Sequence, residues 1–142
     1  MDPVFETAPY TTECIGCGAL IEATVVEVLT AGTHQWDLEG ECQICGHHWN
    51  ECGYTAPLAG MRAAILAANG PATMRLVGGN ITTAEIMRAL RTVRTLPLVE
   101  ARNLAAKLGE PGLEGTRVEV EALAAPLRAI GAIVHIRSAD TM

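Results

Sequence analysis

The chain has 142 residues, of which 49% are hydrophobic but only 4% aromatic, and its formal net charge is -6. This length leaves room for two small domains, whose cores must be built from Ala, Val, Leu and Ile rather than from large rings. No apolar run approaches the roughly 18 residues of a membrane span, and Met1-Asp2-Pro3 does not open a signal sequence. We therefore expect a cytoplasmic protein that does not contact a membrane.

Charge divides sharply along the chain. No Lys or Arg precedes Arg62, whereas nine of the 16 acidic residues do. Nucleic-acid binding gains most of its affinity from cations that neutralise phosphates. The N-terminal part is therefore a poor DNA or RNA binder by itself.

Two C-x-x-C pairs, Cys14-Ile15-Gly16-Cys17 and Cys42-Gln43-Ile44-Cys45, organise this acidic part. In a tight turn, cysteines three positions apart point their sulfurs at one ion while backbone N–H groups hydrogen-bond the thiolates. Gly18 and Gly46 follow the two pairs, where a turn that leaves the metal often needs a positive φ. The spacing predicts one structural zinc ion with four thiolate ligands, namely Cys14, Cys17, Cys42 and Cys45.

Disulfide bonds or redox chemistry for the cysteines, and metal binding by the histidines, are less favoured. Paired C-x-x-C motifs without a signal peptide favour metal over disulfides, and a redox motif would need one such pair near a βαβ unit. Four sulfurs fill the coordination sphere, which leaves His34, His47 and His48 for solvent or packing. Cys52 stays open among a buried apolar residue, an inert surface thiol and a redox-active thiol.

The pattern around the cysteines predicts a small three-stranded antiparallel zinc ribbon over residues 1–57. The strands are expected at Leu20–Leu29, Thr33–Glu39 and His47–Thr55, because polar and apolar residues alternate there. Residues 1–13 contain two prolines and little periodicity, and are expected to form an extended arm.

Residues 58–71 are Ala-rich and predict a helix that connects the two domains or covers the edge of one. Beyond it, residues 72–142 predict a second domain with the order β-α-α-β-α-β, which makes the whole protein α+β. Thr82 and Glu85 form a capping box at the start of its first helix. The other elements are a strand at Ala72–Val77, a helix from Pro97 to Gly109, a strand at Leu113–Glu121, a helix that begins near Pro126 or is kinked there and ends at Gly131, and a strand at Ala132–Arg137.

Three segments of this second domain carry a family resemblance. Ile86-Met87-Arg88-Ala89-Leu90-Arg91 is similar to I-K-A-V-R, Leu96–Leu104 to L-G-L-K-E-A-K-D-L, and Gly131–Ile136 to G-A-x-V-x-V. These are motifs of the acidic bacterial ribosomal stalk protein called L-seven/L-twelve, and residues from about Met74 to Ile136 resemble its C-terminal domain. The stalk protein's N-terminal dimerisation segment and hinge are absent, and a zinc ribbon takes their place.

The resemblance implies a protein-docking surface. In that family the first two helices and the turn between them recruit translational GTPases. Carried over by position, the contact residues would be Arg88, Arg91, Leu98 and Arg102. Pro97 stands where the family commonly has a glycine, which stiffens the turn.

These features predict a non-catalytic zinc-binding adaptor whose arginine-bearing helix face engages an acidic protein surface, such as that of a translational GTPase. Alternatively, the arginine-bearing helix face is an ordinary solvated surface without a partner. The arginines could also dock on the acidic ribbon, which would give self-association between two chains or a compact monomer within one. The other hypothesis is a nucleic-acid-binding zinc ribbon that regulates transcription or translation. In that case the arginines would supply most of the affinity for the phosphates. The sequence holds no Ser/His/Asp motif, phosphate loop or H-E-x-x-H, so we do not expect an enzyme.

Overall fold

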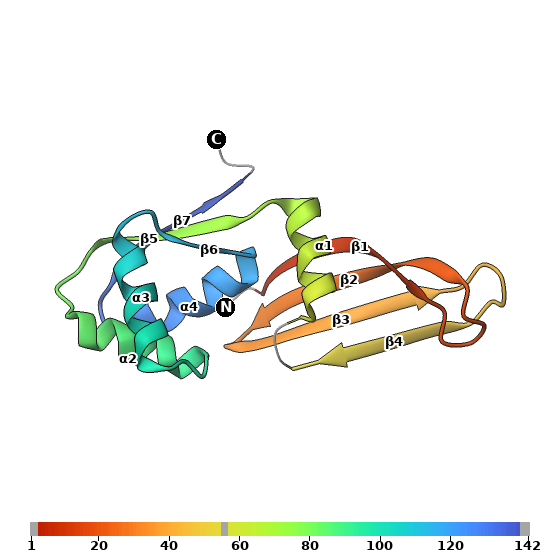
Figure 1. Ribbon diagram of the computed structural model, residues 1–142, viewed down its shortest axis with the longest axis horizontal. Helices are drawn as coiled ribbons and strands as arrows, with labels where there is room; N and C mark the ends of the chain where they lie inside the picture. The colour runs from red at the N-terminus through yellow and green to blue at the C-terminus, as the bar shows by residue number, and fades with distance from the viewer. Residues whose placement is uncertain (1–2, 55–56, 140–142) are drawn as a thin grey trace. The chain divides into compact units, whose positions relative to one another are not determined.

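The computed structural model describes residues 3–54 and 57–139, and the chain divides into two compact units, Met1–Gly70 and Pro71–Met142. Each unit combines helix with an antiparallel sheet, so the α+β class is confirmed (Figure 1). Among the described helices, none has the length and apolar character needed to cross a bilayer.

The first unit is built on a four-stranded sheet rather than the expected three-stranded one. Strands β1 (Val4–Glu13), β2 (Leu20–Thr30), β3 (Thr33–Glu41) and β4 (His48–Gly53) lie side by side in chain order, each antiparallel to the next (Figure 1). The prediction that residues 1–13 form an extended arm was therefore wrong. Residues from Val4 to Glu13 form β1 and pair with β2. Of the third predicted strand, Thr55 lies outside the described residues.

A proline explains why β1 was missed. Pro9 pairs with Thr24 in the middle of the ladder, where a proline argues against a central strand because it has no N–H to donate. However, β1 is an edge strand, and there a proline nitrogen needs no partner. Exposure alternates along the strand, so its pattern is that of a half-buried sheet.

Helix α1 (Ala59–Asn69) packs on β1 and β2 and completes the core of the first unit. Its buried Met61 and Ile65 join residues of the sheet in one apolar cluster. The Asn69 side chain donates a hydrogen bond to the carbonyl of Thr7 at 2.9 Å, which ties the end of the helix to β1. The members of this cluster from the sheet are Ala8, Ala23, Val25 and Leu38.

The second unit has the predicted order β-α-α-β-α-β. Its elements are β5 (Ala72–Gly78), α2 (Thr83–Val93), α3 (Leu98–Gly109), β6 (Leu113–Gly115), α4 (Arg117–Ala129) and β7 (Ile133–Ser138). The sheet order is β6-β5-β7, and both neighbours of β5 are antiparallel to it. Val134 and Ile136 of β7 are partly buried against the core. The core itself is formed by buried residues of the other five elements and of the turn before β7: Ala72, Met74, Ile86, Ala89, Leu90, Ala105, Leu108, Leu113, Val120, Leu123, Ala124, Leu127 and Ala132.

Two capping boxes begin helices of this unit. At α2, the backbone N–H of Glu85 donates to Thr82 Oγ1 at 3.2 Å and the Thr82 N–H donates to Glu85 Oε1 at 3.1 Å, so that prediction is confirmed. At α4, Thr116 and Glu119 repeat the pattern with distances of 3.1 and 3.0 Å. Each box satisfies two N–H groups that the first helical turn leaves unpaired.

The predicted strand Leu113–Glu121 is wrong beyond Gly115. Thr116 caps a helix instead, and α4 runs on through Pro126 to Ala129. The misreading arose because Val118 and Val120 seemed to alternate with charged residues, whereas α4 is buried on most of its sides and shows no clean apolar stripe.

Candidate metal centre

The two C-x-x-C turns are built as local copies of each other. In both, the N–H of the glycine after the pair donates to the carbonyl of the first cysteine at 2.8 Å. Gly18 and Gly46, the glycines concerned, have φ values of 77° and 75°. A side chain at either position would strain the backbone, since residues other than glycine rarely adopt such angles. Local backbone geometry thus turns each pair of sulfurs inward.

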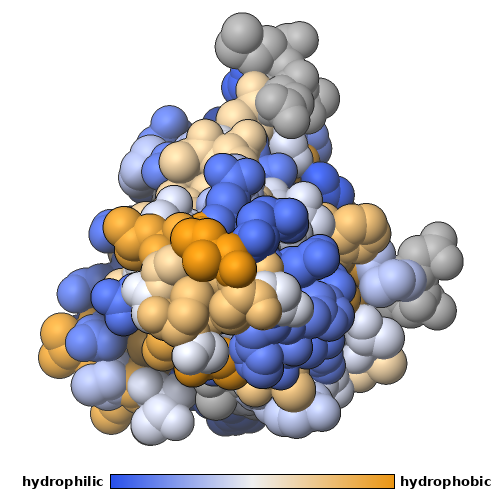
Figure 2. Space-filling model, turned by 90° about the vertical axis from the view of Figure 1, so that its right-hand side faces the viewer, coloured by the Kyte–Doolittle hydropathy of each residue, from blue (hydrophilic) through white to orange (hydrophobic). Residues whose placement is uncertain are grey.

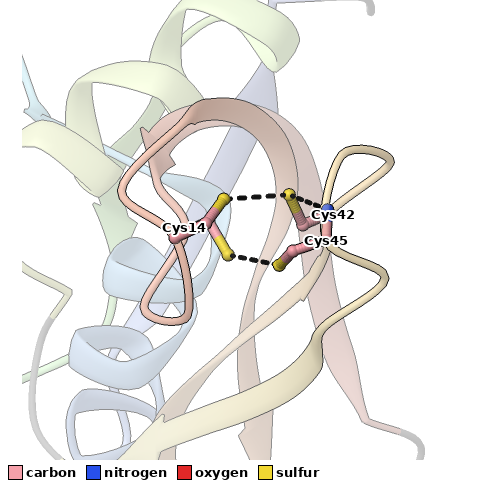
Figure 3. A group of neighbouring side chains, drawn as sticks. Cys14, Cys42 and Cys45 are labelled. Atoms are coloured by element: carbon pink, nitrogen blue, oxygen red, sulfur yellow. Dashed lines mark hydrogen bonds between the residues drawn. The ribbon is translucent and has the colours of Figure 1, made fainter.

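The four sulfurs meet at the end of the first sheet. Cys14 and Cys17 lie between β1 and β2, and Cys42 and Cys45 between β3 and β4, so alternate connections of the sheet face each other (Figure 3). All four sulfur atoms lie within 4.8 Å of one another. The Cys14–Cys45 distance is 3.6 Å and the Cys17–Cys42 distance is 3.7 Å.

These distances fit a tetrahedral thiolate site. A disulfide would hold its two sulfurs at about 2.0 Å, and all five cysteines are free thiols. A tetrahedron with zinc–sulfur bonds of about 2.3 Å has edges of about 3.8 Å, close to the two observed separations. The cluster is therefore compatible with one metal ion bound by four thiolates.

Backbone donors support the negative charge of the sulfurs. The N–H of Gly16 donates to Cys14 Sγ at 3.3 Å, and that of Cys45 donates to Cys42 Sγ at 3.5 Å. The hydrogen bonds from the backbones of Cys45 and Ile44, together with neighbouring thiols, lower the pKa of Cys42 to about 7. Without a cation, the lowered pKa makes the Cys42 thiol easier to ionise than an ordinary cysteine.

The sulfurs of Cys17 and Cys45 resist ionisation when no cation is present. At Cys45, the backbone N–H of His47 favours the thiolate, but burial and the sulfurs of Cys14, Cys42 and Cys17 outweigh it and raise the pKa to about 12. The pKa of Cys17 is also raised: a backbone hydrogen bond at Ala19 lowers it, and burial with the Cys42 thiol outweighs that effect. Four sulfurs at this spacing need a cation before all can be thiolates.

Tryptophan packs beneath the centre. Trp49 is buried in one cluster with Cys14 and Cys42, and its ring lies over Gly40, the residue opposite it on β3. A Cβ atom at Gly40 would come within 2.5 Å of that ring, so no larger residue fits. Gly40 and Trp49 thus hold β3 and β4 together directly below the second cysteine pair.

None of the three candidate histidines belongs to the sulfur cluster. His34 Nε2 lies 2.6 Å from Oε2 of the fully buried Glu27. The ring of His47 stacks on Trp49 with centroids 5.8 Å apart, and His48 Nε2 lies 3.4 Å from Glu39 Oε1. Cys52 is exposed on β4.

The second unit carries a shallow groove where α2 meets the start of α3. Its volume is about 330 Å³, and its lining residues are Ala84, Met87, Arg88, Arg91, Thr92 and Leu98. Three of the four residues inferred from the stalk resemblance, Arg88, Arg91 and Leu98, therefore share one surface, while Arg102 is not among the lining residues. Arg91 Nε also donates to the carbonyl of Leu96 at 3.0 Å, which braces the turn between the helices.

Sequence reasoning missed two features of these surfaces. Met87 contributes apolar lining to the groove. The sequence could have indicated this, because Met87 lies four residues before Arg91 and so shares its face of the helix. Ile15 and Ile44 are exposed inside the C-x-x-C turns, where the metal requires only the cysteines. Their apolar character in a solvated turn was the signal for a contact surface.

Comparison of the chain with protein-family models, with curated proteins and with solved structures found no match. These comparisons give no support to a ribosomal-stalk-like second domain, and that resemblance stays a prediction from three sequence segments.

Proposed function

We propose that this protein is a non-catalytic zinc-binding adaptor. The zinc ion makes the first unit a rigid, acidic zinc ribbon extended by one strand, and the groove between α2 and α3 docks on an acidic protein surface. The observation that carries the metal part is the meeting of four cysteine sulfurs within 4.8 Å of one another. Such a site is closed, so the ion has a structural role and leaves no position for a substrate.

Metal content is the first test. Elemental analysis of reduced, purified protein should give one zinc ion per chain, because an all-thiolate tetrahedral site favours zinc. A thiol titration should find one accessible cysteine, Cys52, and four more only after a strong chelator is added. Protein without bound transition metal, or with five equally reactive thiols, would contradict the proposal.

Groove chemistry supports docking on a protein. Arg88 and Arg91 offer planar guanidinium groups suited to carboxylates. Leu98 is 63% exposed, which supplies the apolar contact that a protein partner would cover. The volume of about 330 Å³ is at the lower end of small-molecule pockets, which run from about 300 to 1,000 Å³.

The element order of the second unit, together with the three similar segments, supports a ribosomal-stalk-like domain. On that resemblance a translational GTPase is a suitable acidic partner. An adaptor of a translational GTPase would act in the cytoplasm, so we propose a cytoplasmic location.

A titration tests the groove directly. Zinc-loaded, ¹⁵N-labelled protein is titrated with a synthetic peptide of alternating Asp and Leu residues, and amide shifts are followed. We expect the largest shifts in α2 and at the start of α3, and a loss of binding of at least about tenfold in Arg88→Glu, which reverses a charge at the contact. Arg94→Glu makes the same change outside the groove lining and should bind as the original protein does.

The same titration separates the nucleic-acid alternative. A generic single-stranded oligonucleotide replaces the peptide, at two salt concentrations. Tight binding that weakens steeply with salt, without peptide binding, would favour the nucleic-acid hypothesis over the adaptor.

A further inference from the structure

The end of the first sheet that carries the cysteines presents an apolar surface. Ile15 is 63% exposed, Leu20 71% and Ile44 76%, and all three lie in or directly after the C-x-x-C turns. Figure 2 looks onto this end and shows hydrophobic side chains gathered at its centre with hydrophilic ones beside them. We call these three residues the knuckle tip. The metal needs none of them, and aliphatic side chains in such turns indicate a covered surface.

Negative charge surrounds the knuckle tip. Glu13 directly precedes the first cysteine and lies opposite Leu20 in the ladder. Glu41 directly precedes the second cysteine pair, and both glutamates are exposed. Four thiolates around a divalent ion add a formal charge of -2. In residues 1–70, Arg62 is the single basic residue against nine acids, so an occupant has to bring its own cations.

The groove between α2 and α3 has the complementary chemistry. Its apolar lining, formed by Ala84, Met87 and Leu98, matches the aliphatic tip, and Arg88 and Arg91 match the glutamates. Residues 71–142 hold nine basic residues against seven acidic ones, so the unit as a whole does not repel the acidic tip.

We infer that the knuckle tip of one copy docks in the α2/α3 groove of a second copy. This names the occupant of the groove and so depends on the groove being the docking site proposed above. The contact is heterologous, because two different surfaces meet, and a dimer therefore keeps one free tip and one free groove to which further copies can add. The tip is small, so association should be weak, with a Kd on the order of 10 µM or weaker.

Sedimentation velocity of zinc-loaded full-length protein from about 1 to 500 µM tests the inference. The average mass should rise with concentration, and more so at low salt than at high salt because opposite charges meet. Ile44→Glu and Arg88→Glu should each remain monomeric over this range. Phe5→Glu alters another exposed apolar residue, at the far end of β1, and Arg94→Glu alters a cation outside the groove lining, so both controls should associate normally.

Mixing the two defective variants gives the decisive result. Ile44→Glu retains an intact groove and Arg88→Glu an intact tip, so an equimolar mixture should form a dimer and grow no further. A mixture that stays monomeric, or original protein that stays monomeric at 500 µM, overturns the inference. If the Asp/Leu peptide still binds the groove in that case, the adaptor proposal survives and only the second copy is wrong as the occupant.

Discussion

The two units of this protein reach stability by different routes. In the first, six buried residues form the main cluster, and the end of the sheet depends on two cysteine turns around the metal position. In the second, thirteen buried residues from helices and strands form one cluster without a metal-binding group among them. A small sheet with few large side chains buries too little apolar surface to be held by it alone, and a metal ion bound by the four cysteines would supply the missing stability.

Metal removal should have the largest effect, because it should unfold the first unit and leave the second unit folded. Chelation, or Cys42→Ser, removes binding free energy of roughly 10 kcal/mol, so the first unit should lose its ordered sheet. The second unit should keep its fold, because its core contains no metal ligand. Amide NMR spectra before and after chelation check this, and the simultaneous loss of signals from both units would show that they are not independent in this way.

A cavity in the second core should have the converse effect. Leu127 is fully buried in α4, so Leu127→Ala should destabilise the second unit by about 2–5 kcal/mol. Zinc content should stay at one ion per chain. Denaturant unfolding followed separately in the two units, with elemental analysis, measures both effects. A drop in zinc content would mean that the two units depend on each other for stability.

Acidification should weaken metal binding by the first unit. Cys17 and Cys45 have raised pKa values, so each must lose a proton when metal binds near neutral pH. Metal affinity should therefore rise with pH and fall by at least about 100-fold for each unit of pH lowered between 8 and 6, with a steeper fall below pH 7, where Cys42 is protonated as well. Competition with a chromophoric chelator at several pH values gives the slope, and a slope near zero would be inconsistent with four thiolate ligands.

The smallest expected effect is the loss of stability when either capping box of the second unit is removed. Thr82→Ala should cost about 1 kcal/mol, because it removes one accepted hydrogen bond at an exposed helix end. Thr116 is fully buried, so Thr116→Ala should cost more, about 2 kcal/mol. Thermal unfolding of both variants measures the difference, and equal losses would mean that burial does not strengthen the cap.

Two local signals were read correctly, while a third local signal and the long-range pairing of the first strand were not. The cysteine spacing and the Thr82–Glu85 box could be predicted, because each is complete within a few residues. The strand at Val4–Glu13 was missed because only its pairing partner shows that Pro9 lies at an edge. Thr116 and Glu119 carried the same signal as Thr82 and Glu85, but apparent alternation beside them suggested a strand.

The groove shows the limit of periodicity. Arg88 and Arg91 are neighbours on one helix, so their common face follows from the sequence. The approach of Leu98 from the next helix depends on how the chain turns between them, which no local pattern determines. The exposure of Ile15 and Ile44 likewise required the folded turns, because in the same turns Cys14 and Cys42 are buried.

Pro9 also makes the two free borders of the first sheet unequal. Strand β1 offers an incoming β-strand a position without a donor and a ring that obstructs close approach, which discourages amyloid-like stacking along that border. Strand β4 contains no proline, so its backbone is the open border among the described strands of this sheet. Strand-to-strand association of the intact sheet should therefore start from the β4 side.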